Sequence, residues 1–207
     1  MENQWLAYVK RLEAIASTGL FFGESDFDKE RYEEIHAIAM DMMASLGKVP
    51  IKQLNGLIDD SGTGYVTPKI DVRAAIIQSN EILLVQEELD GLWTLPGGYA
   101  DLGISGADNI IKEVWEEASI EVKTTKLYGV FHKAKHHYDQ DIRDFYKMFF
   151  LCEQVGDSLP APGMETKAVG YFNPNKLPPL SKGRIIEEHI QLAFRHMNDQ
   201  KLPTDFD

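Results

Sequence analysis

The sequence predicts an α/β (α+β) sandwich around a mixed sheet, preceded by a small helical hairpin domain. Two long stretches near the start place apolar residues at helical spacing. Beyond residue 70, short apolar runs bounded by turn residues alternate with two further helical patterns. Strands and helices mixed in this order are typical of a sheet covered by helices.

Composition limits the classes of protein that fit. The 207 residues carry 21 basic and 33 acidic side chains, a formal net charge of -12. An acidic protein is repelled by nucleic acid, so we expect no DNA-binding module. No apolar stretch is long enough to span a membrane, and from the residues at the start we expect no signal peptide. The single cysteine, Cys152, lies in an apolar run, and we expect a buried thiol in a cytoplasmic protein.

Residues 4–47 predict the helical hairpin. Residues three and four apart form an apolar face in its first helix: Trp5, Val9, Leu12 and Ala16. The apolar seam of the second helix consists of Tyr32, Ile35, Ala39, Met42 and Leu46. We expect Ser25 or Asp26 to cap the second helix, Gly47 to end it, and residues 19–23 to form the connecting loop. A hairpin of this size cannot bury its apolar stripe alone, so we expect it to form a homodimer.

A polar, turn-rich cluster at Asp59–Gly64 predicts a domain boundary. We therefore divide the chain into a helical module with its linker, residues 1–66, and a second domain, residues 67–207. In the second domain we expect strands at 71–78, 81–86, 92–95, 126–131, 146–153 and 168–172, with helices at 105–119 and 184–197. Ser79-Asn80 is the expected hairpin turn between the first two strands.

The helix expected at 105–119 carries three acidic side chains on one face. At 3.6 residues per turn, Glu113, Glu116 and Glu117 share an arc of roughly 100°. The opposite, buried face consists of Ala107, Ile111, Val114, Trp115 and Ala118. Ser105 is the expected cap, with Asp108 in the position of a capping box.

Three neighbouring carboxylates repel one another unless a cation lies between them. Hard divalent ions such as Mg²⁺ or Mn²⁺ prefer oxygen ligands, so either would resolve the repulsion. The preceding loop, Pro96-Gly97-Gly98, lets backbone carbonyls approach the same ion. A solvated acidic helix face is the alternative, and the glycine loop upstream favours the metal site.

Residues 98–120 resemble the box of the Nudix hydrolases, G-x5-E-x7-R-E-U-x-E-E-x-G-U, where U is aliphatic. The matching positions are Gly98, Glu113, Val114, Glu116, Glu117 and Ile120. Ile104 stands where the pattern has Glu, Lys112 where it has Arg, and Ser119 where it has Gly. In the family that Glu and that Arg are usually paired, and here both have changed together. The altered pair could leave Lys112 free for a phosphate.

The resemblance covers nearly the whole chain. Segments typical of the family are Asp71–Ala75, Leu83–Glu87 and Leu95–Gly98. The hairpin, with Arg31-Tyr32 in its second helix, is similar to an accessory module of some bacterial members. The whole arrangement resembles the CDP-choline pyrophosphatases, whose N-terminal helices help to build a dimer.

The resemblance implies metal-dependent hydrolysis of a nucleoside diphosphate linked to another group. It implies that Glu113, Glu116, Glu117 and the carbonyl of Gly97 bind Mg²⁺ or Mn²⁺. We take Glu165 as the candidate general base, because several members place an acid in a loop just before a strand. Glu117 is the competing candidate, and an ordinary loop acid is the plain alternative for Glu165.

Substrate contacts are expected from Arg73, Trp93, Gly98, Tyr99 and Lys112. Arg73 lies in an apolar strand and needs either a ligand phosphate or an internal ion pair. Trp93 and Tyr99 can stack on a base or a cation, and packing in the core or at its rim is the alternative.

Four functions remain open on the sequence alone. CDP-choline hydrolysis to CMP and phosphocholine is the first expectation. Hydrolysis of ADP-ribose or a sugar nucleotide is the second. Cleavage of an RNA 3′ end is the third, supported only by the locally basic segment 123–147. A catalytically silent ligand sensor of the same fold is the fourth, and the complete set of glutamates argues against it.

Overall fold

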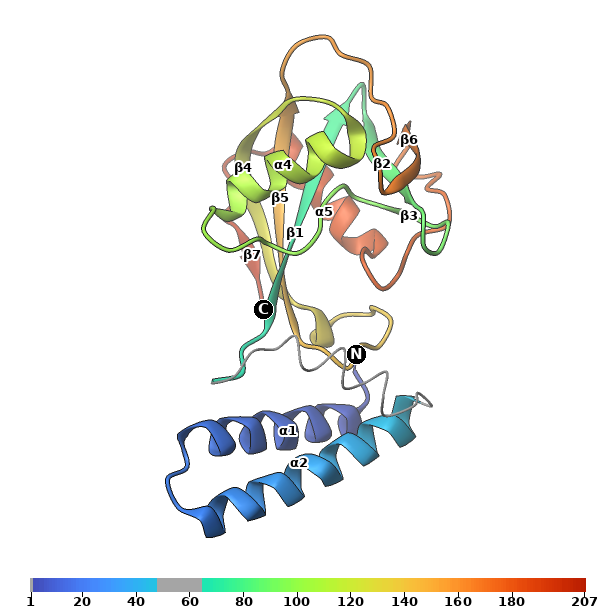
Figure 1. Ribbon diagram of the computed structural model, residues 1–207. Coiled ribbons are helices and arrows are strands. Elements are labelled where there is room, and N and C mark those ends of the chain that lie inside the picture. Colours follow the sequence, from blue (N-terminus) through green and yellow to red (C-terminus); the bar gives the residue numbers. More distant parts are fainter. Residues whose placement is uncertain (1, 48–64) are drawn as a thin grey trace. The chain divides into compact units, whose positions relative to one another are not determined.

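The computed structural model describes residues 2–47 and 65–207, and the predicted boundary at Asp59–Gly64 lies outside these residues. The chain divides into two compact units (Figure 1). The hairpin unit comprises the residues up to Pro68 together with Gln140–Asp144. The sheet unit comprises Lys69–Asp139 and Phe145–Asp207. None of the helices described is long and apolar enough to cross a membrane.

Two antiparallel helices form the hairpin unit, α1 (Gln4–Phe22) and α2 (Asp26–Gly47). The loop expected at residues 19–23 is wrong, because α1 continues to Phe22 and Gly23 closes it by donating its N–H to the Gly19 carbonyl at 2.8 Å. Gly19 lies inside the helix. The ring of Tyr32 on α2 occupies the space that a side chain at residue 19 would need. The glycine therefore permits the close approach of the two helices.

The core of the hairpin differs in part from the expected stripe. Val9 and Ala16 on α1 and Ala39 on α2 are buried as predicted. Two further methionines complete the core on α2, Met40 and Met43. The predicted members Trp5, Leu12 and Leu46 are exposed, because the buried faces are rotated by a fraction of a turn from the predicted arcs.

The sheet unit contains a mixed sheet of seven strands. They are β1 (Lys69–Gln78), β2 (Glu81–Glu87), β3 (Trp93–Thr94), β4 (Val122–His132), β5 (Phe145–Gln154), β6 (Thr166–Phe172) and β7 (Asp205–Phe206). Their order is β3-β2-β1-β5-β4-β7, and β6 pairs with β2. The β1–β5 and β4–β7 pairs are parallel and the others antiparallel. Two elements were not predicted, the two-residue strand β7 and a 3-10 turn, η2 (Lys133–Lys135).

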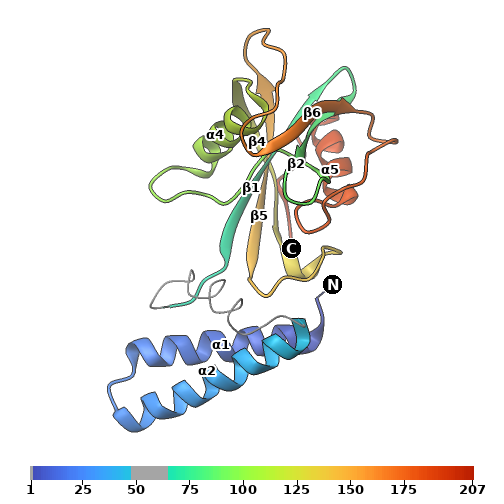
Figure 2. The same cartoon turned by 45° about the vertical axis from the view of Figure 1, so that its right-hand side comes forward.

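Two helices cover opposite faces of this sheet, α4 (Gly106–Ala118) and α5 (Glu187–Asn198), as Figure 2 shows. Side chains of a strand alternate between faces, and β1 follows this rule. Val72, Ala74 and Ile76 pack in the core under α4, whereas Ala75 packs in the core under α5. The predicted α/β/α sandwich and mixed sheet are confirmed. Cys152 is buried, and burial raises the pKa of its thiol to about 12, as expected for an unreactive cysteine.

The first prediction concerns the end of α4. Ser119 caps this helix in the left-handed conformation, with φ 56° and ψ 30°, at the position where the Nudix pattern has Gly. A side chain is strained in that region and glycine is not. We expect Ser119→Gly to raise the free energy of unfolding by roughly 0.5–1 kcal/mol, measured by urea denaturation. Ser119→Ala retains the strain, and a gain as large as that of the glycine variant would contradict this explanation.

Candidate active site

The site lies where β1 and β2 separate. The two strands pair only near the hairpin turn, at Ile77–Ile82 and Gln78–Glu81. Towards its start, β1 pairs instead with the loop that follows β3. The N–H of Ala74 donates to the Pro96 carbonyl and that of Val72 to the Gly98 carbonyl, both at 2.9 Å. The glycine loop is therefore held along β1 on both sides of Gly97.

Only glycine fits at the centre of this loop. Gly97 has φ +139°, and a side chain there would collide with the Val72 carbonyl. At Gly98 a side chain would meet the carboxylate of Glu113, 2.8 Å from one of its oxygens. Both glycines thus bring loop backbone and carboxylates together, which is the arrangement expected from the sequence.

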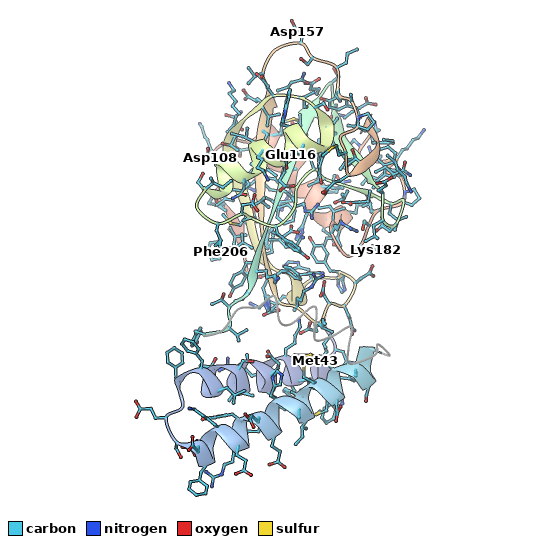
Figure 3. The ribbon with its side chains drawn as sticks, in the orientation of Figure 1. Met43, Asp108, Glu116, Asp157, Lys182 and Phe206 are labelled. Atoms are coloured by element: carbon cyan, nitrogen blue, oxygen red, sulfur yellow. The ribbon has the colours of Figure 1, made fainter. Side chains whose placement is uncertain are left out.

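Helix α4 presents the three glutamates at different depths. Ser105 caps it as predicted, accepting the N–H of Asp108 at 3.1 Å. Ile110, Val114 and Ala118 pack on the sheet. Trp115, which we expected on this buried face, is exposed because the face is centred closer to the glutamates. Glu117 is consequently buried, Glu113 half-buried and Glu116 exposed, and Figure 3 labels Glu116 on α4.

Burial changes the acidity of these carboxylates. One Glu117 oxygen accepts the Gly97 N–H at 2.9 Å. Burial raises the pKa of Glu117 to about 8, although Arg73 and the Gly97 N–H oppose the rise. Burial also raises the pKa of Glu113. Ionising a buried carboxylate costs free energy, and a bound cation offsets that cost. Such a carboxylate is therefore well suited to serve as a ligand of a cation.

The fate of Arg73 corrects an expectation. We favoured a substrate phosphate as its partner, but the structure contains the alternative, an internal ion pair. The guanidinium is 3% exposed and donates to both carboxylate oxygens of Asp71, at 3.0 and 2.9 Å. A third N–H donates to the Leu95 carbonyl at 3.1 Å. Arg73 therefore holds the chain just before the glycine loop.

A buried lysine completes this ion pair. Lys147 on β5 donates to Asp71 at 2.7 Å and is 1% exposed. Burial alone would raise the pKa of Asp71, but Arg73 and Lys147 hold it at about 2. Burial lowers the pKa of Lys147 to about 8 against the attraction of Asp71. Asp71 thus stays ionised between two cations near the site.

The remaining predicted substrate contacts lie around the loop. Trp93 is half-buried against Phe172, with ring centroids 4.6 Å apart, so core packing accounts for it. Tyr99 stacks on Phe145 at 5.7 Å and is 47% exposed, next to Gly98. Lys112 is paired with acidic neighbours and is not free for a phosphate, contrary to our expectation.

Glu165 lies on an exposed loop that is fastened to α4. The hydroxyl of Thr166, the next residue, donates to the Glu117 carbonyl at 2.8 Å, and the Gly163 N–H donates to the same atom at 3.2 Å. A side chain at Gly163 would collide with the Glu116 carbonyl. The candidate base is therefore carried on backbone that touches the helix of the metal-ligand candidates.

The sequence reasoning missed an acidic residue at the end of β2. A bulge between Gln86 and Glu87 interrupts the β2–β6 pairing where Glu87 faces Thr166. Arg184 donates to Glu87 at 3.1 Å and to Asp90 at 2.9 Å. Burial raises the pKa of Glu87, which Arg184 and Arg73 oppose. The sequence did offer one signal for Glu87, because this acid directly follows the apolar strand expected at 81–86.

The donor set fits a hard divalent cation in its chemistry. Three carboxylates and a glycine-rich loop supply only oxygen ligands. Within the described ranges, 2–47 and 65–207, no three acidic, histidine or cysteine side chains gather around one point. Glu116 is turned towards Lys112, at 3.3 Å, whereas Glu113 and Glu117 face the loop. Glu116 is exposed, so rotation of its side chain would bring it towards the other two.

Comparison with known families decides the identity. The model of the NUDIX domain matches residues 67–192, more than half of the chain. The chain belongs to the Nudix hydrolase family. A second model, described as a UDP-X-like N-terminal oligomerisation domain, matches residues 3–58. The family and its relatives support an enzyme of the nucleotide pyrophosphatase class.

Two of the relatives of this Nudix hydrolase match nearly its whole length, and a third matches about two thirds of it. It is 35% identical over 207 residues to a putative ADP-ribose pyrophosphatase, YjhB, of Bacillus subtilis, covering 100% of this chain and 99% of the relative. A crystal structure of a UDP-X diphosphatase matches 98% of each chain at 29% identity, with a TM-score of 0.63. The crystal structure of an ADP-ribose pyrophosphatase from Streptococcus suis covers 68% of this chain and 100% of that one, at 41% identity and a TM-score of 0.62.

The second prediction is a pH dependence of the metal-free Nudix hydrolase. The pKa of Glu117 is about 8 in the folded chain against an ordinary value of 4.5, so the folded state binds a proton that the unfolded state releases. Stability from this carboxyl is complete below pH 4.5 and is lost as the pH rises through 8. In EDTA, we compare the free energies of unfolding of Glu117→Gln and the wild type by urea denaturation. The difference in favour of the variant should increase by roughly 2 kcal/mol as the pH rises from 5.5 to 7.5. A difference that stays constant with pH would contradict the assignment.

Proposed function

We propose that this enzyme hydrolyses the pyrophosphate of ADP-ribose or of a related nucleoside diphosphate sugar, with Mg²⁺ or Mn²⁺ as cofactor. One observation carries the chemistry: the carboxylates of Glu113 and Glu117 face a glycine loop held along β1. The substrate class is supported by the names of the full-length relatives, a putative ADP-ribose pyrophosphatase and a UDP-X diphosphatase. The reaction adds water across the phosphoanhydride and yields two phosphate monoesters.

We assign the roles of the residues from the family pattern and from their positions. Glu113, Glu116, Glu117 and the Gly97 carbonyl would hold the metal ion. Once bound, the ion would neutralise the pyrophosphate and activate water. Arg73 acts through the loop, by holding the Leu95 carbonyl. Glu165, exposed on its loop, takes the proton from the attacking water.

CDP-choline, our first expected substrate, is not supported by the comparisons. The full-length relatives carry the names of ADP-ribose and UDP-X enzymes, which match the alternative that we kept open. ADP-ribose therefore replaces CDP-choline as the first expected substrate, and CDP-choline becomes a comparison in the test.

RNA cleavage loses most of its support in the structure. Of the basic residues in segment 123–147, Lys133 and Lys147 are buried and Lys123 pairs with Glu153 at 2.9 Å. Lys126 donates to the carbonyls of Gln200 and Leu202. An NAD-capped RNA hydrolase of Pseudomonas putida is 26% identical over 56% of this chain, and the match covers 40% of that protein. The segment does not offer a continuous basic surface for RNA.

A panel of substrates tests the proposal. ADP-ribose, UDP-glucose, CDP-choline and a short RNA are each incubated with the enzyme and Mg²⁺, and the products are separated by chromatography. We expect kcat/KM to be highest for ADP-ribose or UDP-glucose, with AMP and ribose 5-phosphate as the products of the former. Preference for CDP-choline by tenfold or more would overturn the substrate class and keep the pyrophosphatase. Preference for RNA by the same factor would overturn both, because the bond cleaved in RNA is a phosphodiester.

The hairpin unit supports the third prediction, a homodimer formed through α1. Four exposed apolar residues follow one another along this helix at spacings of three or four: Trp5, Tyr8, Leu12 and Ile15. The family model that matches this region is described as an oligomerisation domain. We expect Leu12→Asp combined with Ile15→Asp to give a monomer in light scattering, whereas the wild type is a dimer. The control is Glu30→Lys, which changes the charge of an exposed residue on α2, and loss of the dimer in this variant would contradict the assignment.

A further inference from the structure

An exposed ion pair is found in the region where this chain departs from the Nudix pattern at two positions. The pattern pairs an acid at position 104 with an arginine at position 112, and this chain has Ile104 and Lys112. In the structure the Lys112 ammonium lies 2.9 Å from a carboxylate oxygen of Asp101. It also lies 3.3 Å from a carboxylate oxygen of Glu116, one turn further along α4.

The position of Asp101 is determined by a buried side chain. Asn109 is 0% exposed, and its side-chain oxygen accepts the Asp101 N–H at 2.8 Å. The amide nitrogen of Asn109 donates to the Ser105 carbonyl at 3.2 Å and to that of Asp101 at 3.4 Å. Gly103, with φ +85°, supplies the turn between them. The backbone of Asp101 is thus fixed at both its N–H and its carbonyl by Asn109, which lies about one helical turn before Lys112.

We propose that Asp101 replaces the missing acid of the pattern, and that its ion pair with Lys112 keeps the Glu116 carboxylate available to a divalent cation. This inference rests on the proposed metal-binding role of Glu116 and on no particular substrate. Lys112 has two acidic partners. Without Asp101 its remaining partner is Glu116, and a metal ion must then displace the ammonium from that carboxylate.

The expected effects follow from charge. Asp101→Asn removes the competing partner of Lys112 and should weaken Mn²⁺ binding roughly fivefold, since one charge at contact distance in water is equivalent to about that factor. Lys112→Met removes the ammonium itself and should strengthen binding by a similar factor. In the Lys112→Met background, Asp101→Asn should change Mn²⁺ binding by less than about twofold, because the partner through which it acts is gone.

The experiment measures Mn²⁺ binding to the full-length protein by electron paramagnetic resonance of the free ion, without substrate. The proteins are the wild type, Asp101→Asn, Lys112→Met and the double variant. Asp157→Asn is the matched control, because it removes one charge from an exposed residue at the tip of the β5–β6 loop, which Figure 3 labels apart from Glu116. The Mg²⁺ concentration that gives half-maximal activity is measured for the same set and should follow the Mn²⁺ affinities.

Restoration of the pattern provides an independent arm. Ile104 is exposed, so Ile104→Glu adds an acid without disturbing the core. Combined with Asp101→Asn it should recover at least half of the lost Mn²⁺ affinity. Because the residues involved are exposed, their variants should unfold within about 2 °C of the wild type.

The outcomes separate this inference from the proposed function. The inference would be overturned if Asp101→Asn lowered Mn²⁺ affinity equally in the wild type and in the Lys112→Met variant. It would also be overturned if Asp101→Asn caused no loss at all. Either result would leave the metal site itself intact. Failure of Glu116→Gln to weaken Mn²⁺ binding would instead overturn the metal-binding role on which both depend. Recovery by Ile104→Glu together with loss of coupling in Lys112→Met supports the ion pair.

Discussion

Glutamine at position 116 should lower kcat for nucleotide hydrolysis by at least about a thousandfold. Glu116 is one of three carboxylates on one face of α4, and the other two already face the glycine loop. A metal ion contributes several kcal/mol to stabilising the transition state, and each 1.4 kcal/mol is equivalent to about tenfold in rate. Steady-state kinetics with saturating Mg²⁺ measures the loss.

Two controls exclude a loss of stability and a general effect of removing one charge. Because the side chain is exposed, its replacement should shift the unfolding temperature by no more than about 2 °C. Glu121→Gln removes the same charge from an exposed position just beyond the helix and should retain wild-type kcat. Retention of more than a tenth of the activity by Glu116→Gln would contradict a role in binding the catalytic metal.

The second large effect is expected at Asp71. Asp71→Asn leaves the buried cations Arg73 and Lys147 without their shared anion. Removing one partner of a buried ion pair costs roughly 3–5 kcal/mol, because the other charge stays buried and unpaired. Thermal denaturation should show a fall in the unfolding temperature of roughly 10 °C.

An exposed ion pair in the same sheet serves as the comparison. Lys123 and Glu153 face each other across β4 and β5 at 2.9 Å, with both side chains more than half exposed. Glu153→Gln should therefore change stability by less than about 1 kcal/mol. If Asp71→Asn were as mild as Glu153→Gln, the buried ion pair would not hold the loop as described.

The carboxylate helix could be predicted from sequence because its evidence is local. Glu113, Glu116 and Glu117 lie within five consecutive residues, and helical periodicity alone places them on one face. The glycine loop was expected beside them because it lies upstream of the helix, whereas its actual position depends on its pairing with β1. Periodicity did not determine how deeply each carboxylate is buried, since that depends on the rotation of α4 against the sheet.

The partners of Arg73 show what sequence could not supply. Asp71 was within reach of prediction, because residues two apart on a strand share a face. Lys147 was not, because it comes from β5, and the parallel register that places it opposite Asp71 is a tertiary property. Without that register, a ligand phosphate was as reasonable a partner for Arg73 as an internal acid.

The Asp101–Lys112 ion pair was missed for a different reason. The family pattern has its acid at position 104, where this chain has Ile104. The replacing acid lies three residues earlier, and only the fold of the loop on Asn109 places it at Lys112. Similarly, the sequence of β2 does not reveal the bulge between Gln86 and Glu87.

We propose that this enzyme breaks the phosphoanhydride of a nucleoside diphosphate sugar with the help of a divalent cation. The most direct test follows ADP-ribose by ³¹P nuclear magnetic resonance in ¹⁸O-enriched water, with Mg²⁺ and then with EDTA. The account predicts that the diphosphate signals are replaced by two phosphate monoesters, one of them carrying ¹⁸O, only when Mg²⁺ is present. Persistence of the diphosphate with Mg²⁺, or equal cleavage in EDTA, would contradict it.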